Sequence, residues 1–401
     1  TKKTGSTATY DHEMFWHSAN IEFLGVRVFT LSIILLVYLC ANSMFFVRDI
    51  SLLQFKNYTQ RHFSFEKDII CLSGENGSGK TSVMDAIYFL CFTKSYFTHN
   101  DAYLVKHGSK GMRIQGVFEK QQPHEICCIL RENGKKEFSM DGELYTQFSK
   151  HIGKFPVVMI APDDTELITE GSELRRRFLD MIISQLNSDY LSHLIQYNKV
   201  LQQRNALLKQ LAQPSGGDAS LLDVYDQLLD QHGKAVYRFR MEVCQALAEK
   251  TNRIYTFLSQ EKEDVSCVYK SALANDSLLD LLQQNRSRDM LMQRTLEGIH
   301  KDDLVFTMNS MPLKQVASQG QRKSFLFGLK FAQYELLAEG LGIKPVLLLD
   351  DIFEKLDEER SRRLVEFVGE QQGQVFITDT HHERIEKAFA PFADRLQHVQ
   401  L

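Results

Sequence analysis

The chain has 401 residues, and its 47 Lys and Arg against 51 Asp and Glu leave a formal charge of −4. With 43% hydrophobic and 24% charged residues, it has the composition of a folded globular protein large enough for two or three lobes. Disordered, collagen-like and mucin-like chains are excluded, because there are only 7 prolines and no low-complexity tract. The acidic balance also excludes attraction of DNA through net charge, so any DNA contact must come from a local basic surface.

The N-terminal residues 1–43 end in an apolar stretch. Residues 33–41 are apolar enough to suggest a membrane span. Once the strand predicted over residues 45–53 is set aside, however, only about fourteen apolar residues remain, and a span needs about 20. We therefore expect residues 1–43 to be an apolar extension that is not part of the fold, with a membrane anchor as the alternative. The fold is expected to begin at Met44.

A glycine-rich motif follows a second predicted strand over residues 68–73. Residues 74–81 read GENGSGKT, the G-x-x-x-x-G-K-T pattern, and residues 82–92 are apolar at helical spacing. A strand, such a loop and a helix together form a phosphate-binding loop, in which backbone N–H groups and the helix N-terminus attract phosphate. Lys80 is expected to reach the β and γ phosphates, and Thr81 to bind Mg²⁺. The predicted nucleotide-binding residues are Gly74, Asn76, Gly77, Gly79, Lys80, Thr81 and Ser82.

A second acidic motif lies near the C-terminus. Residues 345–349 (PVLLL) predict a buried strand that runs into the adjacent carboxylates of Asp350 and Asp351. Together with the phosphate loop, this pattern predicts an ATP site in which Asp350 holds Mg²⁺ and Asp351 orients or polarises the attacking water. Lys80 and Asp351 are therefore the predicted catalytic residues. Because about 270 residues separate the two motifs, a large insert must divide one nucleotide fold into two halves.

The insert is predicted to be helical. Apolar residues recur at helical spacing over residues 171–213, and again over 219–258 after a Pro-Ser-Gly-Gly break. Two continuous arms of this length would each span about 60 Å. A third helical segment, residues 277–298, returns the chain to the ATPase lobe. The expected units are an N-terminal half of the lobe at 44–165, a helical arm or lid at 166–299, and a C-terminal half at 300–401.

Further motifs give these patterns a family resemblance. An S-x-G-Q motif at 318–321 precedes a helix predicted over 324–338, and a Leu-Asp pair at 356–357 follows the acidic strand. This order of motifs resembles an ABC-type ATPase head of the SMC kind. Five stretches narrow the resemblance to the RecF family of bacterial recombination mediators: LQFKNY at 53–58, KS at 94–95, RRRFLD at 175–180, HKDD at 300–303 and SQGQ at 318–321.

The resemblance implies an α/β fold, in which an ABC-type P-loop ATPase head is assembled from N- and C-terminal segments and carries an inserted helical arm. In this family two heads enclose two ATP molecules, so Ser318, Gly320 and Gln321 would contact the γ-phosphate bound to a second copy. Asp357 would be the D-loop aspartate at the dimer interface. A capped turn before a helix is the alternative for residues 318–321, and a helix N-cap is the alternative for Asp357.

The resemblance also implies a function. The chain would be a cytoplasmic, ATP-dependent DNA-binding protein of recombinational repair, replication-gap processing and the SOS response. It would form an ATP-gated homodimeric clamp with Mg²⁺ as cofactor, act as a weak DNA-stimulated ATPase at gaps or single-strand/double-strand junctions, and help to load recombinase with RecR and RecO as partners. The alternatives are an ABC transporter-type nucleotide-binding subunit and a structural nucleotide switch without turnover. A membrane partner is not expected.

The position of a DNA-binding surface is left open by the sequence. Arg175, Arg176 and Arg177 are the candidates, since residues 171–210 contain six basic and three acidic residues. Pairing of these arginines with acids of the ATPase lobe is the alternative. The histidines of the DTHH stretch at 379–382 cannot be assigned as a γ-phosphate sensor by spacing, and a Q-loop is expected within residues 156–164.

Overall fold

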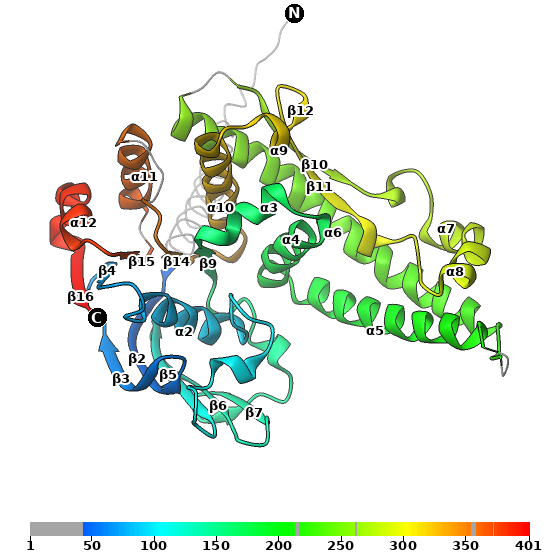
Figure 1. Ribbon diagram of the computed structural model, residues 1–401, viewed down its shortest axis with the longest axis horizontal. Coiled ribbons are helices and arrows are strands. Elements are labelled where there is room, and N and C mark those ends of the chain that lie inside the picture. The colour runs from blue at the N-terminus through cyan, green and yellow to red at the C-terminus, as the bar shows by residue number, and fades with distance from the viewer. Residues whose placement is uncertain (1–42, 214–215, 261–262, 354–357, 372) are drawn as a thin grey trace, which may run out of the picture.

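The computed structural model describes residues 43–213, 216–260, 263–353, 358–371 and 373–401. Residues 1–42 of the predicted extension lie outside the described residues. Ser43 pairs with Ile343 in a two-stranded parallel sheet made of β1 (Ser43–Met44) and β13 (Ile343–Lys344). The described fold therefore begins one residue before the predicted boundary. Figure 1 shows two lobes on the left and a helical arm that extends away from them.

A five-stranded parallel sheet lies at the centre of the molecule, in the order β16-β4-β15-β14-β9. Strands β4 and β9 precede the helical insert, and the other three follow it, so the predicted assembly from two chain segments is confirmed. Both faces of the sheet are covered, which explains why its strands are continuous apolar runs rather than alternating ones. The strands are β4 (Ile69–Ser73), β9 (Val157–Ile160), β14 (Val346–Leu349), β15 (Val375–Asp379) and β16 (Leu396–Gln400).

Two buried helices cover opposite faces of this sheet. Ile70 and Leu72 of β4 pack in one apolar cluster with helix α2 (Lys80–Phe92), whereas Ile69 and Cys71 pack in another with helix α10 (Gln319–Leu341). Alternate side chains of one strand therefore serve two different cores. Helices α11 (Glu358–Glu370) and α12 (His382–Ala388) also lie beside the sheet. The short helix α3 (Glu166–Thr169) packs on α10, and α9 (Leu313–Val316) packs on residues 303–312.

A six-stranded antiparallel sheet forms the second layer under α2, in the order β3-β2-β5-β6-β7-β8. The long hairpin of β2 and β3 brings the LQFKNY stretch to the phosphate loop. The strand predicted over residues 45–53 is thus confirmed as β2. The strands are β2 (Phe46–Phe55), β3 (Tyr58–Ser64), β5 (Met112–Lys120), β6 (Gln122–Leu130), β7 (Lys136–Met140) and β8 (Glu143–Leu144).

The helical arm differs from its prediction in two respects. The segment 171–213 is two helices, α4 (Ser172–Leu186) and α5 (Ser188–Leu211), because the Asn187 side chain accepts hydrogen bonds from the first N–H groups of α5. Helix α6 (Leu221–Ser259) has 39 residues and spans about 58 Å, near the expected length, whereas α5 spans only about 36 Å. The third segment is divided into α7 (Leu278–Gln284) and α8 (Arg286–Met292).

The second difference is a small sheet that crosses the predicted boundary at residue 299. Strand β10 (Val265–Lys270), inside the predicted helical insert, pairs antiparallel with β11 (Asp303–Met308), which in turn pairs with β12 (Met311–Pro312). The base of the arm and the C-terminal half of the ATPase lobe therefore share one sheet.

A buried ionic cluster fastens the far part of the arm. The Arg204 guanidinium of α5 donates to Asp226 of α6 and to Asp289 of α8, each at 2.7 Å, and all three side chains are fully buried. Such a cluster stabilises a unique packing only when every charge has a partner, and removal of one partner is costly. Arg204, one of the six basic residues counted between 171 and 210, is thus a structural residue.

Two buried histidines make the stability of the fold sensitive to acid. Burial lowers the pKa of both His151 and His300 from the ordinary value of 6.5 to about 4. The unfolded chain would bind these protons near pH 6.5, whereas the folded chain binds them only near pH 4. We therefore expect the free energy of unfolding to fall by about 2 kcal/mol per histidine between pH 7 and pH 5.

Urea unfolding at both pH values measures this loss. His151→Gln should reduce it by about half, whereas His107→Gln, at an exposed position, should leave it unchanged. An identical pH dependence in wild type and His151→Gln would contradict the assignment.

Candidate nucleotide site

The phosphate loop lies between β4 and α2 at the edge where the parallel strands end. Gly79 has a φ of 111°, and a Cβ there would lie 2.4 Å from the Tyr58 hydroxyl, so only glycine fits. The loop borders a cavity of about 290 Å³. The residues that line it are Lys56, Asn57, Asn76, Gly77, Gly79, Lys80, Thr81, Ser82 and Asp351. Six of the seven predicted nucleotide-binding residues thus surround one cavity, and Gly74 is the exception.

The structure places the predicted Mg²⁺ ligands beside each other. The Thr81 hydroxyl donates to the Asp350 carboxylate at 3.0 Å, although the two residues are far apart in sequence. The Thr378 hydroxyl at the end of β15 also donates to Asp350, at 2.6 Å. Burial raises the pKa of Asp350 above its usual range, and the hydrogen bonds from Thr378 and Thr81 oppose this shift. A carboxylate and a hydroxyl are hard oxygen ligands, the type that Mg²⁺ requires.

Lys80 and Asp351 lie on the same cavity. The Lys80 ammonium donates to the backbone oxygens of Gly74, at 2.7 Å, and Glu75, at 3.0 Å. Asp351 adopts the left-handed conformation with a φ of 47°, and its backbone N–H donates to Thr378 at 2.9 Å. Thr378 therefore orients both adjacent aspartates, a role that the sequence pattern did not reveal.

Two more residues of the cavity wall escaped the sequence prediction. Lys56 and Asn57 come from the turn between β2 and β3 and line the cavity. The Asn57 side chain donates to the Ser78 backbone oxygen at 3.2 Å, and the Lys56 ammonium lies 2.6 Å from the buried carboxylate of Asp85. The LQFKNY stretch was a signal for the family, but nothing in its spacing placed it beside the phosphate loop.

The S-x-G-Q segment begins α10 and does not line this cavity. Ser318 and Gln321 form a reciprocal capping box, in which the Ser318 hydroxyl accepts from the Gln321 N–H and the Gln321 side chain accepts from the Ser318 N–H. A Cβ at Gly320 would lie 2.3 Å from an Arg360 nitrogen. Asp357 lies outside the described residues.

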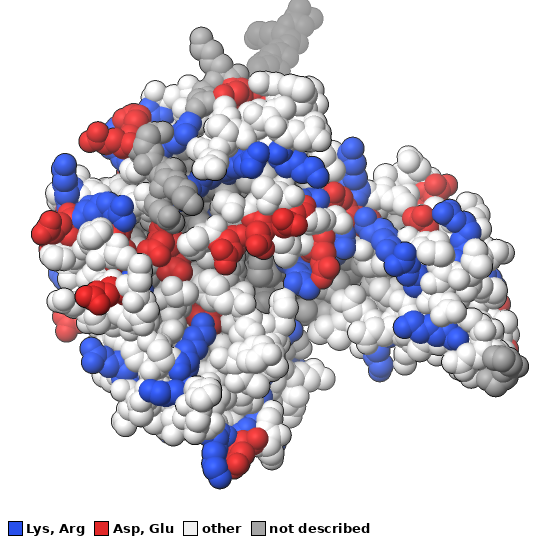
Figure 2. Space-filling view, viewed as in Figure 1, with Lys and Arg blue, Asp and Glu red and all other residues white. Residues whose placement is uncertain are grey.

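The arginine candidates for DNA contact are largely engaged within the chain. Arg175 makes a two-point ion pair with Asp303, and Arg176 donates to the Asp302 backbone oxygen at 2.7 Å. Arg177 is half-exposed and pairs with Glu173 at 2.5 Å. The alternative pairing with the ATPase lobe thus holds for Arg175. Elsewhere on the face in Figure 2, Lys and Arg side chains gather over the helical arm.

The segment expected to hold the Q-loop contains Asp164 rather than glutamine. The Asp164 carboxylate accepts from the Ala161 N–H at 2.8 Å and pairs with the Lys330 ammonium at 3.0 Å. Of the two histidines after β15, His381 donates its backbone N–H to Asp379 and His382 begins α12. Neither histidine lines the cavity.

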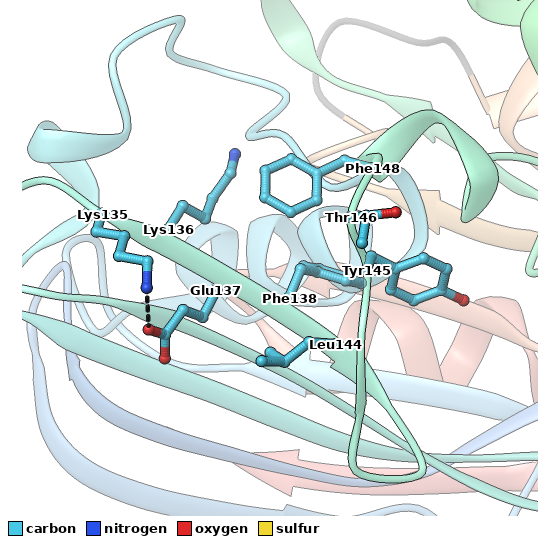
Figure 3. A pocket seen from close by; sticks show the side chains of 8 residues that line it. All are labelled: Lys135, Lys136, Glu137, Phe138, Leu144, Tyr145, Thr146 and Phe148. Carbon is cyan, nitrogen blue, oxygen red and sulfur yellow. Dashed lines mark ion pairs between the residues drawn. The ribbon is translucent and has the colours of Figure 1, made fainter.

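A second surface hollow, of about 260 Å³, lies at the far end of the antiparallel sheet. Figure 3 shows its lining, in which the Lys136 side chain points toward Phe148 and Lys135 points toward Glu137. Lys135 pairs with Glu137 at 3.2 Å and Lys136 with Asp101 at 2.7 Å, so both cations already have acidic partners. None of the predicted nucleotide-binding residues lines this hollow.

Within the described residues, no group of three or more His, Cys, Asp or Glu is arranged to hold a metal ion. An ion such as Mg²⁺, which takes few protein ligands and retains water or phosphate oxygens, does not need such a group. Among the helices of the described ranges, none combines the length and apolar character needed to cross a membrane.

Comparison with known proteins gives consistent matches. Residues 46–400 match the family model of the RecF/RecN/SMC N terminal domain. The chain is 45% identical over 342 residues to the DNA replication and repair protein RecF of Flavobacterium johnsoniae, which covers 85% of this chain and 95% of the relative. It is 40% identical over 345 residues to the RecF of Phocaeicola vulgatus, with 85% and 92% covered.

Solved structures agree with these relatives. The recombination mediator protein RecF with ATP superimposes with a TM-score of 0.79 at 27% identity, over 84% of this chain and 93% of that one. An Smc head domain of Pyrococcus furiosus matches with a TM-score of 0.53 at 16% identity, a likeness of fold alone. The sequence resemblance and the predicted ABC-type ATPase head are thus confirmed. The chain belongs to the RecF family.

Proposed function

We propose that this chain is an ATP-dependent DNA-binding protein of recombinational repair and replication-gap processing. Two copies would close on DNA when ATP binds and separate after slow, DNA-stimulated hydrolysis. The observation that carries the proposal is the approach of Thr81 to Asp350 at 3.0 Å, beside the phosphate loop and across the two halves of the fold. The relatives named as DNA replication and repair proteins support this function over a transporter-type subunit.

Each residue of the cavity has a distinct role in this proposal. Thr81 and Asp350 would hold Mg²⁺, which neutralises phosphate charge when bound. Lys80 would exchange the loop oxygens of Gly74 and Glu75 for phosphate oxygens. Asp351, which lines the cavity, would accept a hydrogen bond from the attacking water and orient it.

The site within one chain lacks the predicted signature segment, which supports a role for a second copy. Ser318 and Gln321 stand at the N-terminus of α10, where backbone N–H groups and the helix dipole favour an anion. If this terminus meets the γ-phosphate of a second copy, ATP binds the dimer more tightly than the monomer and must shift the equilibrium toward it. Asp357 would lie at the same interface.

We propose that the helical arm, rather than the arginine run, contacts DNA. Arg175 and Arg176 donate within the chain, whereas basic side chains gather on the arm in Figure 2. We expect contact with the phosphate backbone rather than base reading. RecR and RecO remain the proposed partners and the loading of recombinase at gaps the proposed outcome, in the cytoplasm.

The mass of the protein in solution tests the dimer. Light scattering of the full chain is expected to give the monomer without nucleotide, the dimer with ATP and Mg²⁺, and a more stable dimer with gapped DNA. Ser318→Arg should hold the protein as a monomer, since a bulky cation would replace the small cap at the interface.

A matched control is Ser277→Arg, which removes the N-cap of α7 instead. Each variant loses about 1 kcal/mol of helix capping, so only the interface differs between them when ATP is added without DNA. A mass that does not respond to ATP or DNA would refute the clamp, and would return the transporter-type subunit and the structural switch to consideration.

A further inference from the structure

We propose that Tyr96 couples the nucleotide cavity to helix α10, so that a nucleotide bound at one end changes the stability of the S-x-G-Q terminus at the other. The proposal rests on the proposed ATP site but not on dimerisation. It follows from a continuous series of buried polar contacts between the two. The participating residues are Lys56, Asp85, Ser95, Tyr96, Asp164 and Lys330.

The series begins in the cavity wall at Lys56. Its ammonium lies 2.6 Å from Asp85, a residue of α2 with no exposed surface. Lys56 is 21% exposed and lines the cavity, so one cation faces both the cavity and a buried carboxylate. An ammonium has three donors, and a phosphate in the cavity would be a second anionic partner for it.

Asp85 links Lys56 to the segment that follows α2. Its carboxylate accepts from the Ser95 hydroxyl at 2.7 Å and from the Tyr96 backbone N–H at 2.8 Å. The Ser95 hydroxyl in turn accepts from the N–H groups of Phe97 and Thr98. The backbone of this segment is therefore held by the same carboxylate that holds Lys56.

The Tyr96 side chain reaches the other face of the lobe. Its hydroxyl donates to Asp164 and accepts from the Lys330 ammonium at 2.8 Å. Lys330 also donates to the Met159 backbone oxygen at 2.9 Å and is only 1% exposed. Burial and the neighbouring Asp164 raise the pKa of Tyr96 well above its usual value, so the hydroxyl remains a donor.

Lys330 belongs to α10, which begins at the capping box of Ser318. The two residues are three turns apart, or about 18 Å along a rigid helix. The Lys330 ammonium forms hydrogen bonds or ion pairs with Tyr96, Asp164 and Met159, and it also lies over the Phe178 ring of α4. A displacement of the cluster is therefore a displacement of α10.

The contacts predict how the signal passes. When a phosphate shares the Lys56 ammonium, the ion pair between Lys56 and Asp85 weakens. Asp85 then depends more on its hydrogen bonds from Ser95 and Tyr96, because a buried carboxylate needs partners. The Tyr96 ring moves with its backbone, and the buried Lys330 ammonium moves with the Tyr96 hydroxyl to which it donates. The N-terminal turns of α10 are then held more firmly before any second copy arrives.

Amide hydrogen exchange of residues 319–326 tests this coupling in the full chain, at a concentration where light scattering gives the monomer mass. ATP with Mg²⁺ is expected to slow exchange about tenfold in wild type, within the usual range of coupling between sites. Tyr96→Phe, which keeps the ring and removes the hydroxyl, should abolish the slowing. Its affinity for ATP should stay within about twofold, because the exchange-competent state is a minor population.

Tyr145→Phe is the matched control, since its hydroxyl also contacts a histidine and a lysine of the same lobe but lies outside the series. It should respond to ATP like wild type. Lys330→Met removes the α10 member of the series of contacts. It provides a second test of the coupling if Tyr96→Phe does not fold. It too should lose the slowing.

The outcomes separate the coupling from the proposed function. A wild-type chain that binds ATP without a change in α10 exchange overturns the coupling and leaves the ATP site intact. Tyr96→Phe and Lys330→Met variants that respond like wild type also overturn it. A chain that binds no ATP, measured separately by calorimetry, refutes the proposed function and this inference together.

Discussion

Alanine in place of Lys80 is expected to weaken ATP binding by at least about 100-fold. The Lys80 side chain is 6% exposed and stands within the phosphate loop, so its ammonium would meet phosphate oxygens in a site with little competing water. Hydrogen bonds to charged groups contribute about 1.5–3 kcal/mol each, and two such bonds account for the loss. Calorimetric titration with ATP and Mg²⁺ measures it directly.

The matched control for this experiment is Lys110→Ala, because Lys110 is a surface lysine paired only with Glu132 in the described structure. It should bind ATP as wild type does. If Lys80→Ala retains wild-type affinity, the cavity beside α2 is not the phosphate site, and the roles assigned to Thr81 and Asp350 are lost with it.

Asparagine in place of Asp351 is expected to slow ATP hydrolysis by about 10²–10³-fold while ATP-dependent dimerisation persists. Asparagine tolerates the left-handed backbone at this position as well as aspartate does, so the substitution changes charge without strain. Steady-state phosphate release and light scattering, measured on the same sample, separate the two effects.

Asp141→Asn provides the control, since Asp141 is also an aspartate in the left-handed conformation, with a φ of 53°, and lies outside the cavity. Its turnover should equal that of wild type. Normal turnover in Asp351→Asn would remove Asp351 from the mechanism, whereas loss of the dimer as well would mean that Asp351 supports the interface rather than the water.

The parts of the site that the sequence predicted are those encoded by local pattern. The phosphate loop, the strand before Asp350 and the cap of α10 each depend on fewer than a dozen consecutive residues, and the structure has all three elements. The pairing of Thr81 with Asp350 was predicted from the combination of two such patterns. The roles of these residues in catalysis remain predictions.

The parts that were missed depend on contacts between distant segments. No sequence pattern near Lys56 indicates its ion pair with Asp85, and none near Arg175 indicates its ion pair with Asp303. The break at Asn187 was hidden because the apolar spacing continues through it, although asparagine is a favoured N-cap residue. Strand β10 was missed because two helices, α7 and α8, separate it in the sequence from its partner β11.

The strand order of the parallel sheet has a consequence for synthesis in the cell. Strand β4, which leads into the phosphate loop, lies between β15 and β16, and both are translated about 300 residues later. At a synthesis rate of 5–20 residues per second, the apolar residues of β4 remain without their neighbouring strands for roughly 15–60 s. During that interval an unpaired edge is available to other chains, so the nascent protein should depend on chaperone protection, and the nucleotide site is completed only after β15 has been translated.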